Sequence, residues 1–239
     1  MCEKHYTIVK TCSNGFNDYA EVRNSLILRP FSLTTRKRSY SGEVGIRKMG
    51  MYLALARLVR ISGRYESWSI HYEEVSNWEI EKTQLVDQAL INMSECIPPR
   101  LFNTEYLENI NFEKKGLFMP NELTHDETKD AARVYTSANC PAFGYVLTNT
   151  GWKNGAVSIL YPGVMYRLGE MLGDYYIVFD GLNDVRIHSI KDNPNGLPKP
   201  FLLRHAAIER NLRRPFDERS LPKIYRYRTA NGRIIEIKP

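Results

Sequence analysis

The chain has 239 residues, of which 43% are apolar and 25% are charged, and it carries a net charge of +6. This composition is typical of an ordinary globular protein of one ample domain or two small ones. No apolar run approaches the roughly 18 residues that a membrane-spanning helix requires, and the N-terminus lacks the apolar stretch of a secretory signal. The sequence therefore excludes a membrane-spanning role and predicts a cytoplasmic protein.

The first half of the chain mixes predicted helices with a predicted strand. Residues 16–28 have apolar side chains near one helical face and predict a helix. Residues 41–60 fit either a helical stripe or a strand, and residues 68–72 alternate as a half-buried strand does. Residues 81–95 form the clearest predicted helix, which Pro98 and Pro99 end.

The middle of the chain is predicted to continue with a loop, two strands and an apolar segment. The polar residues 101–139 predict a loop with at most short helices, whereas residues 143–148 have strand character. Residues 156–172 are apolar on several faces and are expected to lie against a sheet, with a break at Pro162-Gly163. The aromatic and β-branched residues 175–179 predict a buried strand.

The C-terminal part begins with a linker-like stretch, residues 191–200, whose three prolines block regular structure. A helix is predicted over residues 201–212. A hairpin is predicted over residues 224–228 and 233–237, because Asn231-Gly232 supplies the positive φ that a turn demands.

The irregular order of these elements and the hairpin signal favour antiparallel neighbours. The predicted fold class is therefore α+β, with a mixed, largely antiparallel sheet packed with helices and a C-terminal β-hairpin. We predict an α+β body over residues 1–190 and a basic helix and hairpin segment over residues 191–239, packed on the body as one domain.

The positive charge is concentrated at the end of the chain. Residues 196–239 hold eleven Lys and Arg against four Asp and Glu, whereas the rest of the chain holds 22 against 23. A basic surface with interleaved aromatic groups is typical of phosphate-backbone or single-strand binding, and the alternative is a solvated face. The candidate residues for binding nucleic acid or another partner are Arg204, Arg210, Arg213, Arg214, Lys223, Tyr225, Arg226, Tyr227, Arg228 and Arg233.

Several segments together resemble a known family. The most characteristic are Gly-Tyr-Val-Leu-Thr-Asn at 144–149, Asn-Gly-Ala at 154–156, Leu-Tyr-Pro-Gly-Val at 160–164 and Leu-Gly-Asp-Tyr-Tyr-Ile at 172–177. Weaker matches lie at 16–28, 78–92 and 224–227. On these residues the chain is similar to an uncharacterised bacterial family, a domain of unknown function common in Gram-positive anaerobes and often found near mobile elements.

One departure from the family bears on catalysis. After the Tyr-Tyr-Ile strand the family usually has Pro-Ser-Ser, a hydrophobic residue and His-Glu. This chain has Asp180-Gly181 in place of the serine pair and Asn183-Asp184 in place of His-Glu. Ser, His and a carboxylate could support nucleophilic or acid–base chemistry, and the imidazole that would act as base is lost here. The candidate catalytic residues that remain are Asp180, Asn183 and Asp184, although Asp180-Gly181 fits a turn better.

No motif predicts a metal or cofactor. The sequence contains no HExxH, GxSxG, GxxxxGK[ST] or GxGxxG, and the five histidines are not spaced as paired ligands. His125 lies among acidic residues that are interpreted as a solvated loop, and Cys140 is interpreted as an inert buried thiol.

These patterns give one leading hypothesis and two alternatives. The first is a non-catalytic binding or regulatory protein that acts on nucleic acid or on a nucleic-acid-binding protein; the mobile-element setting that the resemblance implies extends it to counter-defence through nuclease inhibition. The first alternative is a hydrolase with a composite site near Asp180–Asp184. The second is a structural or assembly protein that uses its tyrosines in a homo-oligomer.

Overall fold

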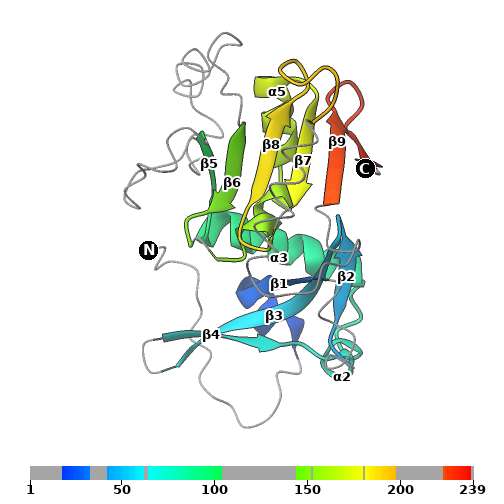
Figure 1. The fold of residues 1–239 in the computed structure, drawn as a ribbon. Coiled ribbons are helices and arrows are strands. Elements are labelled where there is room, and N and C mark those ends of the chain that lie inside the picture. Colours follow the sequence, from blue (N-terminus) through cyan, green and yellow to red (C-terminus); the bar gives the residue numbers. More distant parts are fainter. Residues whose placement is uncertain are drawn as a thin grey trace, which may run out of the picture. The chain divides into compact units, whose positions relative to one another are not determined.

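The computed structural model describes residues 18–32, 42–61, 64–103, 144–151, 153–179, 181–197 and 223–237. The chain divides into two compact units, Met1–Ile97 and Pro98–Pro239, and each carries its own antiparallel sheet. The predicted boundary near residue 190 falls within the second unit. The α+β fold class is confirmed, because antiparallel sheets and helices build both units (Figure 1).

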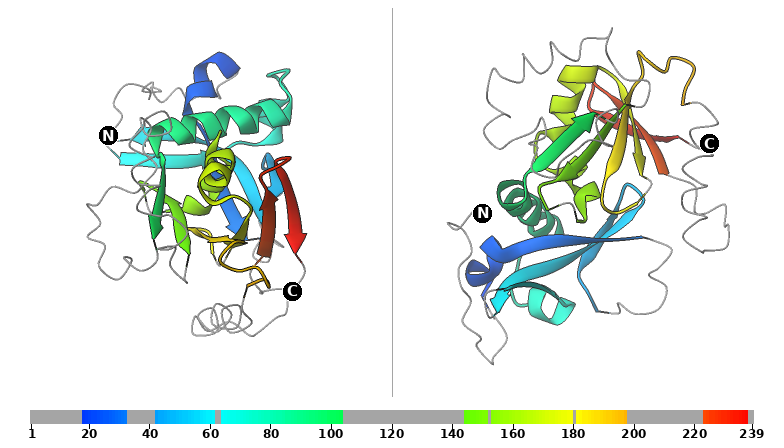
Figure 2. Two further views of the ribbon diagram at one scale, coloured as in Figure 1. Left: turned by 90° about the horizontal axis from the view of Figure 1, so that it is seen from above. Right: turned by 60° about the vertical axis from the view of Figure 1, so that its left-hand side comes forward.

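The first unit is organised around β3, a long strand that pairs with β1 along one edge and with β2 and β4 along the other. Helix α3 lies against β1 (Figure 2). The elements of this unit are α1 (Tyr19–Val22), the 3₁₀ helix η1 (Arg23–Ser25), β1 (Leu26–Ser32), β2 (Gly45–Lys48), β3 (Met51–Ile61), β4 (Arg64–Ser69), α2 (Tyr72–Val75) and α3 (Lys82–Cys96).

The ambiguous residues 41–60 form strands rather than a helix. Lys48 pairs with Met51, so Met49 and Gly50 form a two-residue turn, with φ of 47° and 73°. Two positive φ values match the right-handed twist of the flanking strands. The run of buried residues at the centre of β3 explains why periodicity left the choice open, since a strand buried on both faces does not alternate.

The predicted helix over residues 16–28 is largely wrong. Of its described residues, only Tyr19–Val22 are α-helical, and β1 begins at Leu26. Leu26 and Leu28 are buried as alternate residues of a strand, and Arg29 precedes a proline, which favours an extended backbone. The strand expected over residues 68–72 ends at Ser69.

Helix α3 confirms the prediction for residues 81–95. Leu85, Ala89 and Met93 are buried in one row, as their four-residue spacing requires. Asn92 ties the helix to the start of β1, because its amide nitrogen donates to the carbonyl oxygens of Arg23 and Leu26 at 2.7 and 3.0 Å. An apolar residue at position 92 would leave both carbonyl oxygens without this donor.

The second unit contains a six-stranded sheet in the order β10-β9-β7-β8-β6-β5, and every described pairing is antiparallel. Its elements are β5 (Pro99–Asn103), β6 (Tyr145–Asn149), the 3₁₀ helix η3 (Gly155–Leu160), α5 (Val164–Leu172), β7 (Tyr175–Phe179), β8 (Val185–Ser189), β9 (Lys223–Arg228) and β10 (Arg233–Ile237).

One face of this sheet packs against η3 and α5, which contact β6 and β9 respectively. The predicted break at Pro162-Gly163 is confirmed, because these residues separate η3 from α5. The strands expected near residues 143–148 and at residues 175–179 are also confirmed. On the other face, Tyr176, Val178 and Ile224 form a small core against which Ile190 and Leu197 pack.

Three predictions for this unit differ from the structure or fall outside the described residues. Leu101–Asn103 belong to β5 rather than to a loop, and β8 has no counterpart in the predicted elements. The helix expected over residues 201–212 lies outside the described residues. None of the described helices is long and apolar enough to cross a membrane.

The C-terminal hairpin is confirmed as β9 and β10. Arg228 pairs with Arg233, so the connecting loop has four residues, and Gly232 supplies the positive φ of 64° that closes it. The hairpin joins the second sheet through β9, which pairs with β7. Its position is therefore fixed by sheet hydrogen bonds.

Replacing Asn92 with alanine tests the link between α3 and β1. We expect Asn92→Ala to lower the free energy of unfolding by about 1–3 kcal/mol, because two carbonyl oxygens near the core lose their donor. Urea unfolding followed by tryptophan fluorescence measures the change. Asp87→Ala, an exposed position of the same helix, is the control and should change stability by less than about 0.5 kcal/mol. Equal effects of the two substitutions would contradict this role for Asn92.

Candidate functional site

The candidate site is the C-terminal hairpin, where the structure describes five of the predicted binding residues. Tyr225, Arg226, Tyr227 and Arg228 lie on β9, and Arg233 begins β10. Lys223 begins β9, but its side chain lies outside the described residues. Four other predicted residues also lie outside them: Arg204, Arg210, Arg213 and Arg214.

The alternating sequence of β9 sends its aromatic and basic side chains to opposite faces of the sheet. Tyr225 and Tyr227 are each only 6% exposed, and they share their face with the cross-strand neighbours on β7. The rings of Tyr227 and Tyr175 stack with centroids 5.0 Å apart, and Tyr225 meets Phe179 edge to face at 5.9 Å. Both tyrosines of β9 are therefore core residues rather than an exposed stacking surface.

Helix α5 holds these rings in place. A side chain at Gly169 would come within 3.1–3.3 Å of Tyr227 and Thr229, so the absence of a Cβ lets α5 approach the hairpin closely. The Tyr175 hydroxyl donates to the carbonyl oxygen of Met165 at 2.9 Å. Burial raises the pKa of Tyr175, so this hydroxyl keeps its proton.

Tyr225 is also held neutral. Burial, aided by the neighbouring carboxylate of Glu236, raises the pKa of Tyr225 to about 12. Glu236 is the direct cross-strand partner of Tyr225 on β10. Tyr225 itself therefore adds no charge to the site at neutral pH.

The opposite face of the hairpin carries three arginines, Arg226, Arg228 and Arg233, which we call the arginine face. Arg228 and Arg233 are direct cross-strand partners, so their side chains leave the same face of the sheet. Both are exposed, and neither forms an ion pair with any residue that the structure describes. Arg226 is half-buried on the same face, two residues before Arg228.

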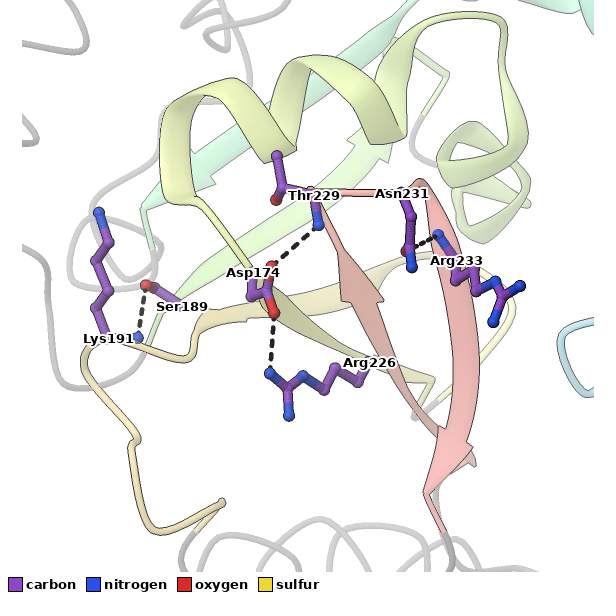
Figure 3. A network of polar contacts seen from close by, with 7 residues as sticks. All are labelled: Asp174, Ser189, Lys191, Arg226, Thr229, Asn231 and Arg233. Carbon is purple, nitrogen blue, oxygen red and sulfur yellow. Dashed lines mark hydrogen bonds and ion pairs between the residues drawn. The ribbon is translucent and has the colours of Figure 1, made fainter.

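Asp174 anchors the base of the arginine face (Figure 3). Its Oδ2 lies 2.9 Å from Nη2 of Arg226, and its Oδ1 accepts the backbone N–H of Thr229 at 3.0 Å. These two hydrogen bonds, that of Arg226 first, hold the pKa of Asp174 below its ordinary value of 3.8. Arg226 is thus paired within the unit, whereas Arg228, whose charge also lowers the pKa of Asp174, and Arg233 form no ion pair with a described residue.

A lysine that the sequence analysis did not select lies at the same end of the sheet. Lys191 follows β8, and its Nζ would lie 3.9 Å from a Cβ at Gly173, which ends α5. The exposed carbonyl oxygens at a helix C-terminus attract a cation. The Lys191 backbone N–H donates to the buried Oγ of Ser189 at 3.2 Å. In the sequence, Lys191 stands out only as the first residue of the proline-rich stretch 191–200.

Asp174 was likewise missed as a site residue. In the sequence it appears only as half of the turn Gly173-Asp174. The structure places its carboxylate beside β9, 52 residues further along the chain. No local pattern predicts that proximity, because it depends on the pairing of β7 with β9.

In the candidate catalytic loop after β7, Asn183 makes hydrogen bonds that hold neighbouring segments together. The Oδ1 of Asn183 accepts the backbone N–H of Asn154 at 3.1 Å, and its carbonyl oxygen accepts the Thr148 hydroxyl at 2.7 Å. Asp184 is partly buried next to β8, and Asp180 lies outside the described residues. The loop between β7 and β8 is thus hydrogen-bonded to β6 and to the residue before η3. Several of the segments on which the family resemblance rests meet at this loop.

No group of His, Cys, Asp and Glu within the described residues is placed to hold a metal ion. Cys140 and His125, with its acidic neighbours, lie outside those residues.

Comparison with known proteins places the chain in a family. A family model described as a family of unknown function, DUF5688, matches residues 3–180. No curated protein and no solved structure matches the chain. The match agrees with the expected uncharacterised domain, and it ends before β8 and the hairpin.

The charge of Asp174 is expected to stabilise the base of the hairpin above pH 3.8, its ordinary pKa. Since its pKa is lowered by folding, this stabilisation is lost as the pH falls below that value. Asp174→Asn keeps an acceptor for Thr229 but removes the charge that pairs with Arg226. We expect the Thr229 amide to exchange faster with solvent in this variant at neutral pH, as measured by NMR. Asp192→Asn, at an exposed acid without such contacts, is the control, and equal exchange in the two variants would count against the anchor.

The structural role of the Asn183 loop is testable at Gly155. A Cβ at Gly155 would collide with the Thr148 hydroxyl and the Asn183 carbonyl oxygen. We expect Gly155→Ala to lower the free energy of unfolding by about 1–3 kcal/mol. The control is Gly181→Ala in the same loop, where a Cβ would meet no atom within 4 Å. Chemical denaturation compares the two variants. If Gly155→Ala is as stable as Gly181→Ala, Gly155 is not closely packed against Thr148 and Asn183.

Proposed function

The chain belongs to DUF5688, a family of unknown function, and we propose that it is a non-catalytic binding protein whose C-terminal hairpin contacts phosphate groups of nucleic acid. One observation carries this proposal. Arg228 and Arg233 are directly opposed on one face of the hairpin, and both are exposed. The hairpin follows the residues that the family model matches, so the proposal concerns this chain rather than the whole family.

Two like charges directly opposite each other weaken a sheet pair. The cost is relieved when an anion lies between the two guanidinium groups. A phosphate suits this position, because the planar fork of an arginine donates two parallel hydrogen bonds to phosphate oxygens. Arg226 keeps its ion pair with Asp174 and stiffens the strand from which Arg228 projects.

The sign of the charge favours nucleic acid itself over a protein that holds nucleic acid. A protein surface built to bind nucleic acid is itself basic, and it would repel the arginine face. A nuclease inhibitor that mimics nucleic acid would need an acidic face instead. The counter-defence role that the resemblance implies therefore receives no support from this hairpin, and it remains a prediction, as does the cytoplasmic location.

No described feature favours the two alternatives. The hydrolase hypothesis relied on Asp180, Asn183 and Asp184. The Oδ1 and carbonyl oxygen of Asn183 instead accept hydrogen bonds from Asn154, just before η3, and from Thr148 of β6. The assembly hypothesis relied on tyrosines at an interface. Five of the described tyrosines are buried within the second sheet: Tyr145, Tyr175, Tyr176, Tyr225 and Tyr227.

Charge reversal on the arginine face tests the proposal. We expect Arg228→Glu with Arg233→Glu to weaken nucleic-acid binding about tenfold or more in dilute salt, because two phosphate contacts become repulsive. The slope of log K against log salt should become shallower by about 2. Fluorescence anisotropy with a labelled oligonucleotide of arbitrary sequence measures both quantities.

The matched control is Arg23→Glu with Lys82→Glu, which makes the same change in net charge at exposed positions of the first unit. This control should bind nearly as well as the unaltered protein. If both double variants lose affinity equally, overall charge rather than the arginine face governs binding. If neither loses affinity, the hairpin is not the site.

A further inference from the structure

We infer that the nucleic acid bound by this hairpin is a duplex, held through its phosphates, rather than a single strand held by base stacking. The inference rests on the proposed function. The burial of each hairpin side chain decides which groups a ligand can contact, and hence which form of nucleic acid fits.

Single-strand binding without sequence preference depends on exposed aromatic rings, on which successive bases stack. The hairpin has two such rings, Tyr225 and Tyr227, and neither is available. Tyr227 is covered by the ring of Tyr175 and by α5 at Gly169, and Tyr225 lies against Phe179. A base could reach these rings only after the sheet had separated from α5.

The groups that the hairpin does expose are cationic, polar or aliphatic, apart from Glu236, which lies on the tyrosine face. Arg228 and Arg233 flank the loop of residues 229–232, and all four loop residues are exposed. Beyond them, Ile234 and Ile235 are 37% and 40% exposed. None of these side chains provides a flat aromatic surface, so the affinity of this surface comes from charge.

The most exposed aromatic residue described in the second unit is Tyr166, at 64%. It lies in the first turn of α5, whereas the helix meets the hairpin at Gly169 and ends at Leu172, next to the Asp174 anchor. Tyr166 is thus placed away from the arginine face. A strand bound to the arginines would not stack on it.

A duplex suits the arginine face because it can be bound through its phosphates, without base stacking on the protein. Its two strands present about one negative charge per 1.7 Å of axis, a denser array than one flexible strand offers. Its major groove also admits a two-stranded β-ribbon, and phosphates line both sides of that groove. The paired arginines on β9 and β10 give such a ribbon one cation on each strand.

Binding of the full chain to a labelled duplex and to each of its separated strands tests the inference. We expect the duplex to bind about fivefold or more tightly than either strand, because its phosphates are more densely spaced and the exposed surface offers no ring on which the bases of a single strand would stack. Arg228→Glu with Arg233→Glu should remove this preference. Tyr166→Ala should leave the affinities for the duplex and for the single strands unchanged, because Tyr166 lies away from the arginine face.

Each outcome separates the inference from the proposed function. If a separated strand binds as tightly as the duplex, and charge reversal still weakens both, the hairpin binds nucleic acid but the duplex assignment is wrong. A loss of single-strand affinity on Tyr166→Ala would also overturn the assignment, since it would reveal stacking on α5. If neither nucleic acid binds, the proposed function itself fails.

Discussion

The packing of Tyr227 between Tyr175 and helix α5 is the contact on which the candidate site depends. In a strand, adjacent side chains point to opposite faces, so burying Tyr225 and Tyr227 on one face commits Arg226 and Arg228 to the other. A shift of β9 by one residue would turn its arginines toward α5 and its tyrosines toward the opposite face. The apolar face therefore fixes the register, and the register determines where the charge lies.

The sequence predicted the elements that carry their own local signal. The hairpin was identified because the turn needs the positive φ of Gly232, and α3 because its apolar residues recur at helical spacing. β8 was missed, although its apolar residues Val185 and Ile187 alternate with Arg186 and His188 as in a strand. The start of β1 was read as a helix, because three or four apolar residues fit either period until a neighbouring strand selects one.

The candidate site was predictable only in part, for a physical reason. The alternation of Tyr and Arg in β9 is visible in the sequence and already implies two faces with different chemistry. Which face is buried depends on Gly169, an unremarkable residue of a helix more than fifty positions earlier. The sequence analysis treated tyrosines and arginines as one binding surface. The structure separates them and adds Asp174, which contacts β9 because β7 pairs with β9, and Lys191, which follows β8 at the same end of the sheet.

The described cations also limit how much of any polyanion binding this end of the sheet can explain. Arg226 is already paired with Asp174, which leaves Arg228, Arg233 and Lys191 as exposed cations. Three phosphate contacts correspond to a salt slope of about −2.7 on duplex DNA. A measured slope near this value would assign the electrostatic part of binding to the hairpin and Lys191. A much steeper slope would require further cations, and residues 196–239 contain other Lys and Arg residues that would supply them.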